Sequence, residues 1–386
     1  MKSLKYCVFT IIVATASLSG FGQQTIHDKA PAKTPVIDGT GAVTFAVDAP
    51  NARSVRVAGA LADKVPSRVE NVDGRWTITY EGLAPDLYDY WFDIDGVRTL
   101  DPSNPYTVRD IASLFNIFIV PGEESNVYMS SDVPHGSVEK VWYKSESLGA
   151  DRRMTVYLPA GYEDSGEEYP VLYLLHGMGG DEEAWSDLGR AIQILDNSIA
   201  SGAAMPMIVV MPNGNARRVS APGYNSEGMY IAEGQHSVDP ERKFETSFPE
   251  IMDYVESHYR VRKEKESRAI AGLSMGGGHS WRISLLQPDD FGYVGLFSAA
   301  VRWNGGGVDA AADPGLEGQI ARQFANPPQL YYIAIGNDDF LYDLNSQYRK
   351  LLDTKGINYI YNETDGGHTW TNWRRYLKDF VPRLFK

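Results

Sequence analysis

The sequence predicts an α/β fold, with a mostly parallel sheet covered by helices on both faces, preceded by a small Ig-like β-sandwich. From residue 138 onward, short apolar strands alternate with amphipathic helices, which is the pattern of a parallel sheet. Before residue 121, strands with period-2 alternation are separated by frequent turn residues. A length of 386 residues is more than one ordinary core needs, so two domains are expected.

The first 22 residues are predicted to be a signal peptide. Two lysines precede the apolar stretch 6–13, and small residues lead to Gly22, after which cleavage is expected. The stretch is too short for a membrane anchor. Cys7 is the only cysteine and lies inside this leader. We therefore expect a bacterial protein, secreted or periplasmic, that has no disulfides and no membrane insertion after cleavage.

A polar linker at 23–35 leads into the predicted sandwich, residues 36–120, and a second linker follows at 121–136. About seven strands are expected, among them 43–47, 54–59, 74–79 and 86–96. The aromatic residues of these strands could stack on sugar rings, but packing in the core is the more common role of strand aromatics. Trp91 points to the opposite face from Tyr90 and is the better candidate for sugar binding.

Within the predicted α/β domain, residues 137–386, the most informative motif is Gly272-Leu273-Ser274-Met275-Gly276. It follows an apolar run and precedes a helix-like stretch at 279–287. A strand, a sharp Gly-x-Ser-x-Gly turn and a helix form a nucleophile elbow, which predicts an α/β-hydrolase fold with Ser274 as nucleophile. Glycines are needed because the serine sits on a strained turn whose neighbours must lack bulk.

The acid and the base of a Ser-His-Asp triad are expected downstream of the nucleophile, in that order. A buried strand at 329–335 ends just before Asp338 and Asp339, and His368 follows a further strand. Groups just beyond the carboxyl ends of neighbouring parallel strands meet at one edge of the sheet. His368 is predicted to take the proton of the serine, with Asp338 or Asp339 orienting the imidazole. A third carboxylate, Asp343, falls inside the following helix.

Two N–H donors are needed for the oxyanion of an acyl-transfer reaction. The residue after the nucleophile, Met275, is expected to supply one. The second is expected from Met178, in the run His176-Gly177-Met178-Gly179-Gly180 that follows a hydrophobic strand. We expect His176 to hold this loop by hydrogen bonds and not to act as the base.

Composition narrows the classes of partner. The formal charge of −14 argues against nucleic acid and against an anionic membrane surface. No HxxxH motif, paired cysteines or carboxylate cluster suggests a catalytic metal, so neither a metal nor another cofactor is expected. A structural Ca²⁺ site stays open.

The hydrolase motifs, together with Trp185 and Gly366-Gly367-His368-Thr369-Trp370, resemble carbohydrate esterase family one, the family of feruloyl and acetyl-xylan esterases. In that family the acid follows a Gly-x-x-Asp pattern, which places it on Asp339 after Gly336. The first domain resembles the early-set sandwich of carbohydrate-binding module family 48, through Ala49-Pro50, Gly74-Arg75-Trp76, Tyr88-Asp89-Tyr90, Asp95-Gly96 and Asp101-Pro102. The stretch 213–245 is longer than this resemblance implies, and we expect it to shape or cover the pocket.

The resemblance implies a serine esterase acting on plant cell-wall polysaccharide or oligosaccharide esters, with ferulate on arabinoxylan as the favoured acyl group. Trp185, Trp303 and Trp370 lie on loops after strands and are expected to wall the pocket, where they suit an aromatic acyl group. Packing under their loops is the alternative for these tryptophans. Alternative functions are an acetyl-xylan esterase, a siderophore esterase of the enterochelin type and, in another class, a non-catalytic carbohydrate-binding protein.

Overall fold

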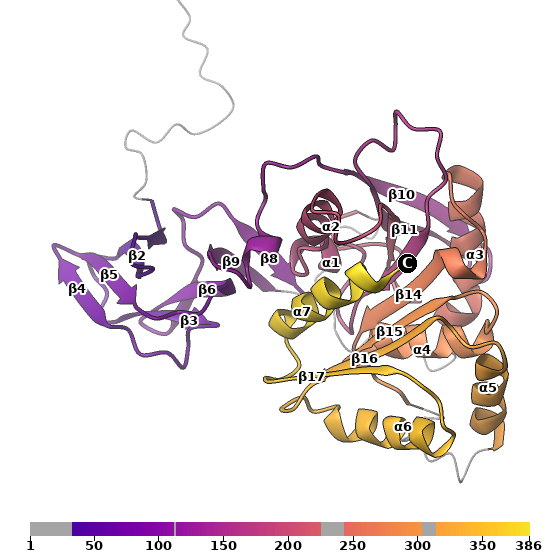
Figure 1. The fold of residues 1–386 in the computed structure, drawn as a ribbon. Helices are drawn as coiled ribbons and strands as arrows, with labels where there is room; N and C mark the ends of the chain where they lie inside the picture. The colour runs from indigo at the N-terminus through magenta and orange to yellow at the C-terminus, as the bar shows by residue number, and fades with distance from the viewer. Residues whose placement is uncertain (1–32, 112, 225–242, 303–313) are drawn as a thin grey trace, which may run out of the picture.

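The computed structural model describes residues 33–111, 113–224, 243–302 and 314–386. Figure 1 shows a β-rich N-terminal part beside a larger part in which helices cover a central sheet. We call these parts the sandwich and the hydrolase part. Trp303 and most of the stretch 213–245 lie outside the described residues, as does the predicted leader.

The sandwich consists of two antiparallel sheets whose apolar faces share one core. One sheet has the order β1-β2-β5-β4 (Val36–Ile37, Val43–Asp48, Arg75–Tyr80, Arg68–Val72). The other has the order β3-β6-β9-β8 (Val55–Gly59, Asp86–Ile94, Ser113–Val120, Thr107–Asp110), with β7 (Val97–Thr99) beside β6. Phe45 joins the two inner faces, since its ring lies 4.8 Å from Tyr90 and 5.3 Å from Phe118. The patterns above name no strand at 107–120, where the structure has β8 and β9.

The hydrolase part is built on one eight-stranded sheet. Its order is β10-β11-β13-β12-β14-β15-β16-β17 (Ser137–Ser145, Ala150–Leu158, Ile208–Pro212, Val171–Leu175, Arg268–Leu273, Tyr293–Phe297, Leu330–Gly336, Ile360–Thr364). The leading pair β10–β11 is antiparallel, as expected, and the pairs from β13 to β17 are parallel. All residues of β12 and β15 are buried, because helices cover both faces of the sheet.

The helices are α1 to α7 (Ala184–Asp187, Ala191–Ala200, Lys243–His258, Met275–Leu286, Pro314–Ala325, Tyr342–Thr354, Trp370–Phe380), with 3₁₀ turns η1, η3 and η4 (Asn126–Tyr128, Lys265–Ser267, Val381–Arg383). Apolar side chains of α3, α4, α5 and α6 share one core on one face of the sheet. Those of α1, α2 and α7 belong to a second core on the other face. The predicted α/β-hydrolase architecture is confirmed.

The outer face of the β3-β6-β9-β8 sheet packs against the hydrolase part near α7 (Figure 1). The buried Arg374 of α7 donates to Asp86 of β6 at 3.2 Å and to the carbonyl of Leu87 at the same distance. At the β8–β9 turn, Arg109 forms an ion pair of 2.6 Å with Asp181. Buried polar contacts of this kind fix how two packed elements meet.

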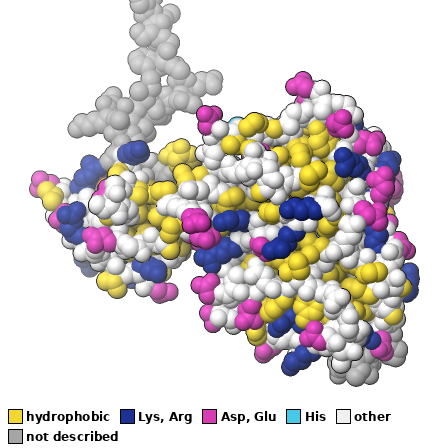
Figure 2. All heavy atoms as spheres, viewed as in Figure 1, with side chains coloured by type: hydrophobic (Ala, Val, Ile, Leu, Met, Phe, Trp, Pro, Cys, Tyr) yellow, Lys and Arg dark blue, Asp and Glu magenta, His cyan; other side chains and the backbone are white. Residues whose placement is uncertain are grey.

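Lysine and arginine side chains gather over α7 in the view of Figure 2. Two basic residues of α7 have a carboxylate beside them: Arg375 pairs with Asp365 at 3.1 Å and Lys378 with Glu124 at 3.4 Å. Within the described residues, no helix is long and apolar enough to cross a membrane.

Candidate active site

Ser274 lies between β14 and α4 in a conformation that L residues seldom adopt, with φ 53° and ψ −115°. Three backbone hydrogen bonds hold it there: its N–H donates to Phe297, and its carbonyl accepts from Gly278 and Ala300, at 2.9 to 3.0 Å. A non-glycine residue in such a region costs on the order of 1–3 kcal/mol and persists only where its surroundings impose it. This is the strained turn that the motif predicts.

Glycine is required at position 276 by a close approach of two chain segments. A Cβ atom there would lie 2.4 Å from the carbonyl oxygens of Leu175 and His176. Gly177 is equally confined, since a Cβ on it would lie 2.5 Å from Leu273 Cδ1 and 3.3 Å from Ser274 Cβ. The elbow and the loop after β12 are therefore packed directly against each other.

The structure brings Asp339, not Asp338, to the histidine. The Nδ1 atom of His368 lies 2.9 and 3.0 Å from the two carboxylate oxygens of Asp339. The Asp339 side chain is fully buried, whereas that of His368 keeps 16% of its surface exposed. Asp339 follows β16 and His368 follows β17, so both sit at the carboxyl edge of the sheet, as does Ser274 after β14. No hydrogen bond joins Ser274 to His368 within the described residues. Catalytic contacts are often loose before substrate binds.

Asp339 is held in its charged form. Burial alone would raise the pKa of this carboxyl, but hydrogen bonds from His368 and from the N–H of Leu341 outweigh it, and the net pKa is lowered. A charged acid that accepts from Nδ1 leaves Nε2 of His368 free to act as an acceptor. The ring of His368 packs against Phe340 at 4.4 Å and Trp373 at 4.9 Å.

Two backbone N–H groups near Ser274 are available for an oxyanion. Met275 opens α4, so its N–H has no acceptor within the helix. The N–H of Met178 donates to no backbone or side-chain oxygen in the described part of the chain. The Met178 side chain is 54% exposed, which leaves this loop open on one side.

His176 holds the oxyanion loop, residues 176–180, from beneath. Its Nδ1 lies 2.7 Å from the carbonyl of Gly177, and its Nε2 accepts from the N–H of Gly214 at 2.8 Å. Complete burial lowers the pKa of His176 to about 4, so the ring is neutral at neutral pH. Its Nε2 is an acceptor and is already occupied, so His176 is a structural residue of the loop.

The tip of the β8–β9 hairpin packs on the other side of the oxyanion loop. A Cβ atom on Gly179 would lie 2.7 Å from Cγ1 of Ile111. Ile111 has a φ of 52°, which is strained for a β-branched residue, and its carbonyl accepts from Arg109 at 3.1 Å. Arg109 also reaches Asp181, just past the loop. Sequence patterns gave no sign of this contact, because it depends on how the sandwich packs.

Residues 145–384 match the model of the family described as putative esterase. The chain belongs to this esterase family. The resemblance of the hydrolase part to an esterase family is therefore confirmed. The chain is 31% identical to an endo-1,4-β-xylanase/feruloyl esterase of Xylanibacter ruminicola, over 91% of this chain and 46% of the relative. It spans about half the length of the curated relatives that it matches.

Solved structures agree on the fold of the esterase. A CE1 ferulic acid esterase of Anaeromyces mucronatus superposes with a TM-score of 0.55 at 25% identity, covering 72% of this chain and 96% of that one. The enterobactin esterase of Shigella flexneri has a TM-score of 0.59 at 16% identity, covering 89% and 92%. At that identity the second likeness concerns the fold alone.

The three tryptophans that were expected to line the pocket lie in different surroundings. Trp185 is 1% exposed and its Nε1 donates to the carbonyl of Leu175 at 2.9 Å, so its prediction as a wall was wrong and it packs the core. Trp370 is half-buried, and it borders a cavity beside His368. Trp303 lies outside the described residues. In the sandwich, the ring of Trp91 is covered by Arg98 at 4.2 Å and borders Phe115.

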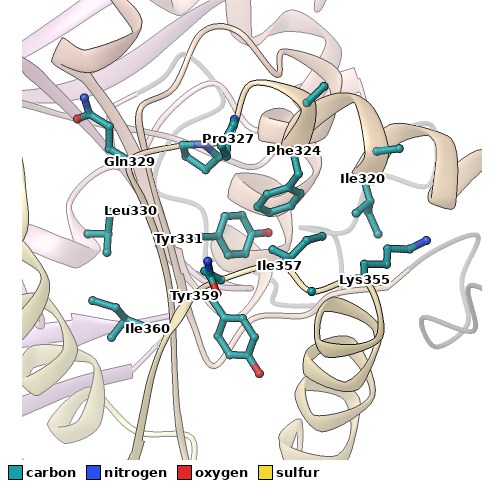
Figure 3. A pocket seen from close by; sticks show the side chains of 15 residues that line it. Ile320, Phe324, Pro327, Gln329, Leu330, Tyr331, Lys355, Ile357, Tyr359 and Ile360 are labelled. Carbon is teal, nitrogen blue, oxygen red and sulfur yellow. The ribbon is translucent and has the colours of Figure 1, made fainter.

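Two cavities of the esterase lie at opposite ends of its strands. One of about 730 Å³ is bordered by the starts of β16 and β17 and by α5, with Phe324, Tyr331 and Tyr359 among its walls (Figure 3). That is the amino edge of the parallel sheet, away from the edge that carries Ser274. The other, of about 470 Å³, contains His368 and Trp370 and is the one placed to hold a substrate.

Proposed function

We propose that this esterase hydrolyses ester decorations of plant cell-wall polysaccharide, with feruloyl groups on arabinoxylan as its preferred substrate. The observation that carries the serine chemistry is the buried Asp339 carboxylate bound to Nδ1 of His368 at 2.9 Å, at the sheet edge where the strained Ser274 lies. The polysaccharide and the acyl group are supported by the relative named as a xylanase and feruloyl esterase. The alignment with this relative covers most of this chain, so it includes part of the sandwich as well as the hydrolase part.

Each proposed catalytic group has one task. Ser274 Oγ attacks the ester carbonyl while Nε2 of His368 takes its proton, and the oxyanion accepts from the N–H groups of Met275 and Met178. The carbon–oxygen bond to the alcohol then breaks, and His368 gives its proton to the departing oxygen. Water repeats the attack on the acyl-enzyme with His368 as base, which releases the acid and restores Ser274. Asp339 stabilises the imidazolium in both steps.

The surroundings of His368 suit an aromatic acyl group. Phe340 is 74% exposed beside the imidazole, and the rings of Trp370 and Trp373 lie 5.1 Å apart, edge to face, nearby. An exposed aromatic at a catalytic rim offers a stacking surface. A small acetyl group would not need it.

We also propose the export and domain organisation stated above. Residues 1–22 act as a leader that is removed after Gly22, and residues 36–120 and 137–386 fold as the sandwich and the esterase domain. The likeness of the sandwich to carbohydrate-binding module family 48 remains a prediction.

The test compares kcat/KM of the mature protein on methyl ferulate and on an acetylated xylo-oligosaccharide, with Ser274→Ala as the blank. We expect a ferulate preference of about a hundredfold and loss of at least about a thousandfold in Ser274→Ala. A preference for acetyl would replace the feruloyl assignment with an acetyl-xylan esterase. Cleavage of p-nitrophenyl acetate alone would point to other esters, such as those of siderophores. Full activity in Ser274→Ala would refute the nucleophile.

A further inference from the structure

The cavity beside His368 has walls from both parts of the molecule. From the hydrolase part come the loop after β17 and the first turn of α7, with Thr369, Trp370, Trp373 and Arg374. The facing wall is the outer face of the β3-β6-β9-β8 sheet, with Asp89, Asp110 and Phe115. Figure 1 places the start of α7 on the side of the hydrolase part that faces β8 and β9. We call this space the interdomain cavity. A group bound in it would touch the sandwich and lie next to the reacting ester.

The sandwich wall presents two carboxylates. Asp89 on β6 pairs with Ile117 of β9, and Asp110 on β8 pairs with Ser113 of β9, so both side chains leave the same face of the sheet. One oxygen of Asp89 accepts from the N–H of Ala60 at 3.3 Å. No side chain among the described residues donates a hydrogen bond to Asp110. Both carboxylates therefore have unused capacity to accept hydrogen bonds from a ligand.

These carboxylates are partly withdrawn from water. Burial raises the pKa of Asp89, and burial together with the charge of Asp89 raises the pKa of Asp110. Arg374 and Arg98 act on Asp89 in the opposite direction, as Arg109 does on Asp110. A ligand that donates hydrogen bonds would offset part of the lost hydration without adding charge.

The hydrolase wall is largely aromatic, with Trp370 and Trp373 beside Arg374. Arg374 is 2% exposed, and its Nε–H has no acceptor among the described residues although its other nitrogens are bonded. The Nε1–H of Trp373, which is 7% exposed, also lacks an acceptor there. Both nitrogen atoms lie beneath the surface of this wall, so they are not donors to a group in the cavity.

A wall with two carboxylates that faces an aromatic wall suits a sugar, whose hydroxyl groups donate hydrogen bonds and whose ring can pack on an aromatic face. We propose that the interdomain cavity binds the sugar on the alcohol side of the ester, with Asp89 and Asp110 accepting from its hydroxyl groups and Trp370 packing against it from the facing wall. This proposal rests on the proposed function, since it takes the alcohol to be a sugar. It makes Asp89 and Asp110 determinants of specificity, although they lie outside the domain that carries the triad. The two carboxylates would repel a polyanionic substrate such as a ferric siderophore.

The first experiment compares two substrates that share one acyl group, methyl ferulate and a feruloylated arabino-xylotriose. Asp110→Asn and Asp89→Asn should each lower kcat/KM on the sugar ester about tenfold, mainly through KM, because the hydrogen bond from the sugar loses its charged acceptor. The methyl ester has no hydroxyl groups there, so its kcat/KM should change less than about twofold. Asp93→Asn is the matched control, since Asp93 lies on the same strand and face but is paired with Arg56 at 3.0 Å. The proposal would be overturned if the ratio of kcat/KM for the two substrates stayed unchanged in both variants. It would also be overturned if Asp93→Asn changed that ratio by the same factor.

A binding measurement separates this proposal from the proposed function. Tryptophan fluorescence is titrated with arabino-xylotriose, which carries no ester, in the wild type and in Asp110→Asn. Binding weakened about tenfold by the substitution, in a protein that cleaves no feruloyl or acetyl ester, would keep the cavity and refute the activity. If the protein cleaved feruloyl esters but neither its rates nor its binding depended on Asp89 or Asp110, the proposed activity would stand and the proposed sugar site would be refuted.

Discussion

Asp339 and Asp338 are adjacent carboxylates with different surroundings. Only Asp339 reaches His368, and its pKa is lowered although burial acts to raise it. Asp338 instead uses its backbone, donating its N–H to the carbonyl of Gly366 at 3.0 Å. One position in the chain therefore separates an orienting carboxylate from a turn residue.

Asp339→Asn should lower kcat by about 10³ to 10⁴ while leaving the fold intact, because the amide keeps the shape but cannot stabilise an imidazolium. Steady-state kinetics on methyl ferulate measures the loss, and circular dichroism checks the fold. The matched variant Asp338→Asn should retain activity within about threefold. Equal losses in both variants would mean that the acid has been misassigned.

His176 should make the protein less stable as the pH falls. The pKa of its folded form is about 4, below the ordinary value of 6.5, so the unfolded chain takes up a proton first. The contribution of His176 to the free energy of unfolding is fully present above pH 6.5, declines below that value, and levels off below pH 4. At pH 5 the loss from this group is on the order of 2 kcal/mol.

Urea unfolding at pH 7 and pH 5 measures this loss of stability. His176→Gln, which cannot titrate, should show a smaller drop in the free energy of unfolding between the two pH values. His258→Gln is the control, because His258 is exposed on α3. Identical pH dependence in the wild type and His176→Gln would contradict the argument.

Among the elements, the β8–β9 hairpin supports the oxyanion loop from the sandwich side. Its tip reaches the loop through Ile111 against Gly179, and Arg109 fastens it to Asp181. Loss of one oxyanion donor commonly costs 10² to 10³ in kcat, so loosening its support should cost less, about tenfold.

Arg109→Ala should therefore lower kcat about tenfold with a smaller change in KM. Arg56→Ala is the control. Arg56 is another arginine of the sandwich, and it forms an ion pair with Asp93 near the end of β6. Both variants are compared with the wild type on methyl ferulate, and thermal unfolding verifies that each is folded at the assay temperature. A change in KM alone would point to a role in binding and away from the loop.

The elements that could be predicted from sequence are those with local signals. The elbow could be predicted because its glycines, its serine and the helix that follows lie within one short segment. The burial of Trp185 could not be predicted, because it depends on distant segments: its ring packs against Phe297 and Trp370. Strands β8 and β9 carry no local signal that was recognised, and their outer face is covered by the hydrolase part. The choice of Asp339 over Asp338 needed the family pattern, since spacing alone fits both.

At the scale of the whole molecule, Arg374 connects the two parts. Its guanidinium donates to Asp86 and Leu87 of the sandwich and to Leu188 of the hydrolase part. Removing one member of a buried ion pair leaves the other charge uncompensated and typically costs 3–5 kcal/mol.

Arg374→Ala should lower the free energy of unfolding by about 3 kcal/mol in urea titrations. Arg383→Ala should change it by less than about 0.5 kcal/mol, because Arg383 pairs with Asp379 at the surface. If Arg374→Ala proved as stable as the wild type, the interface would not depend on this residue.

The eight-stranded sheet has a long border strand, β10, whose outer row of backbone groups pairs with no other strand among the described residues and could pair with another chain. Its exposed side chains include Glu139, Lys140 and Lys144, and Lys140 is fixed by Glu183 at 3.2 Å. A strand from a second molecule would have to strip water from these charges before it could add to the sheet. These three charged side chains thus protect the border strand against edge-to-edge aggregation.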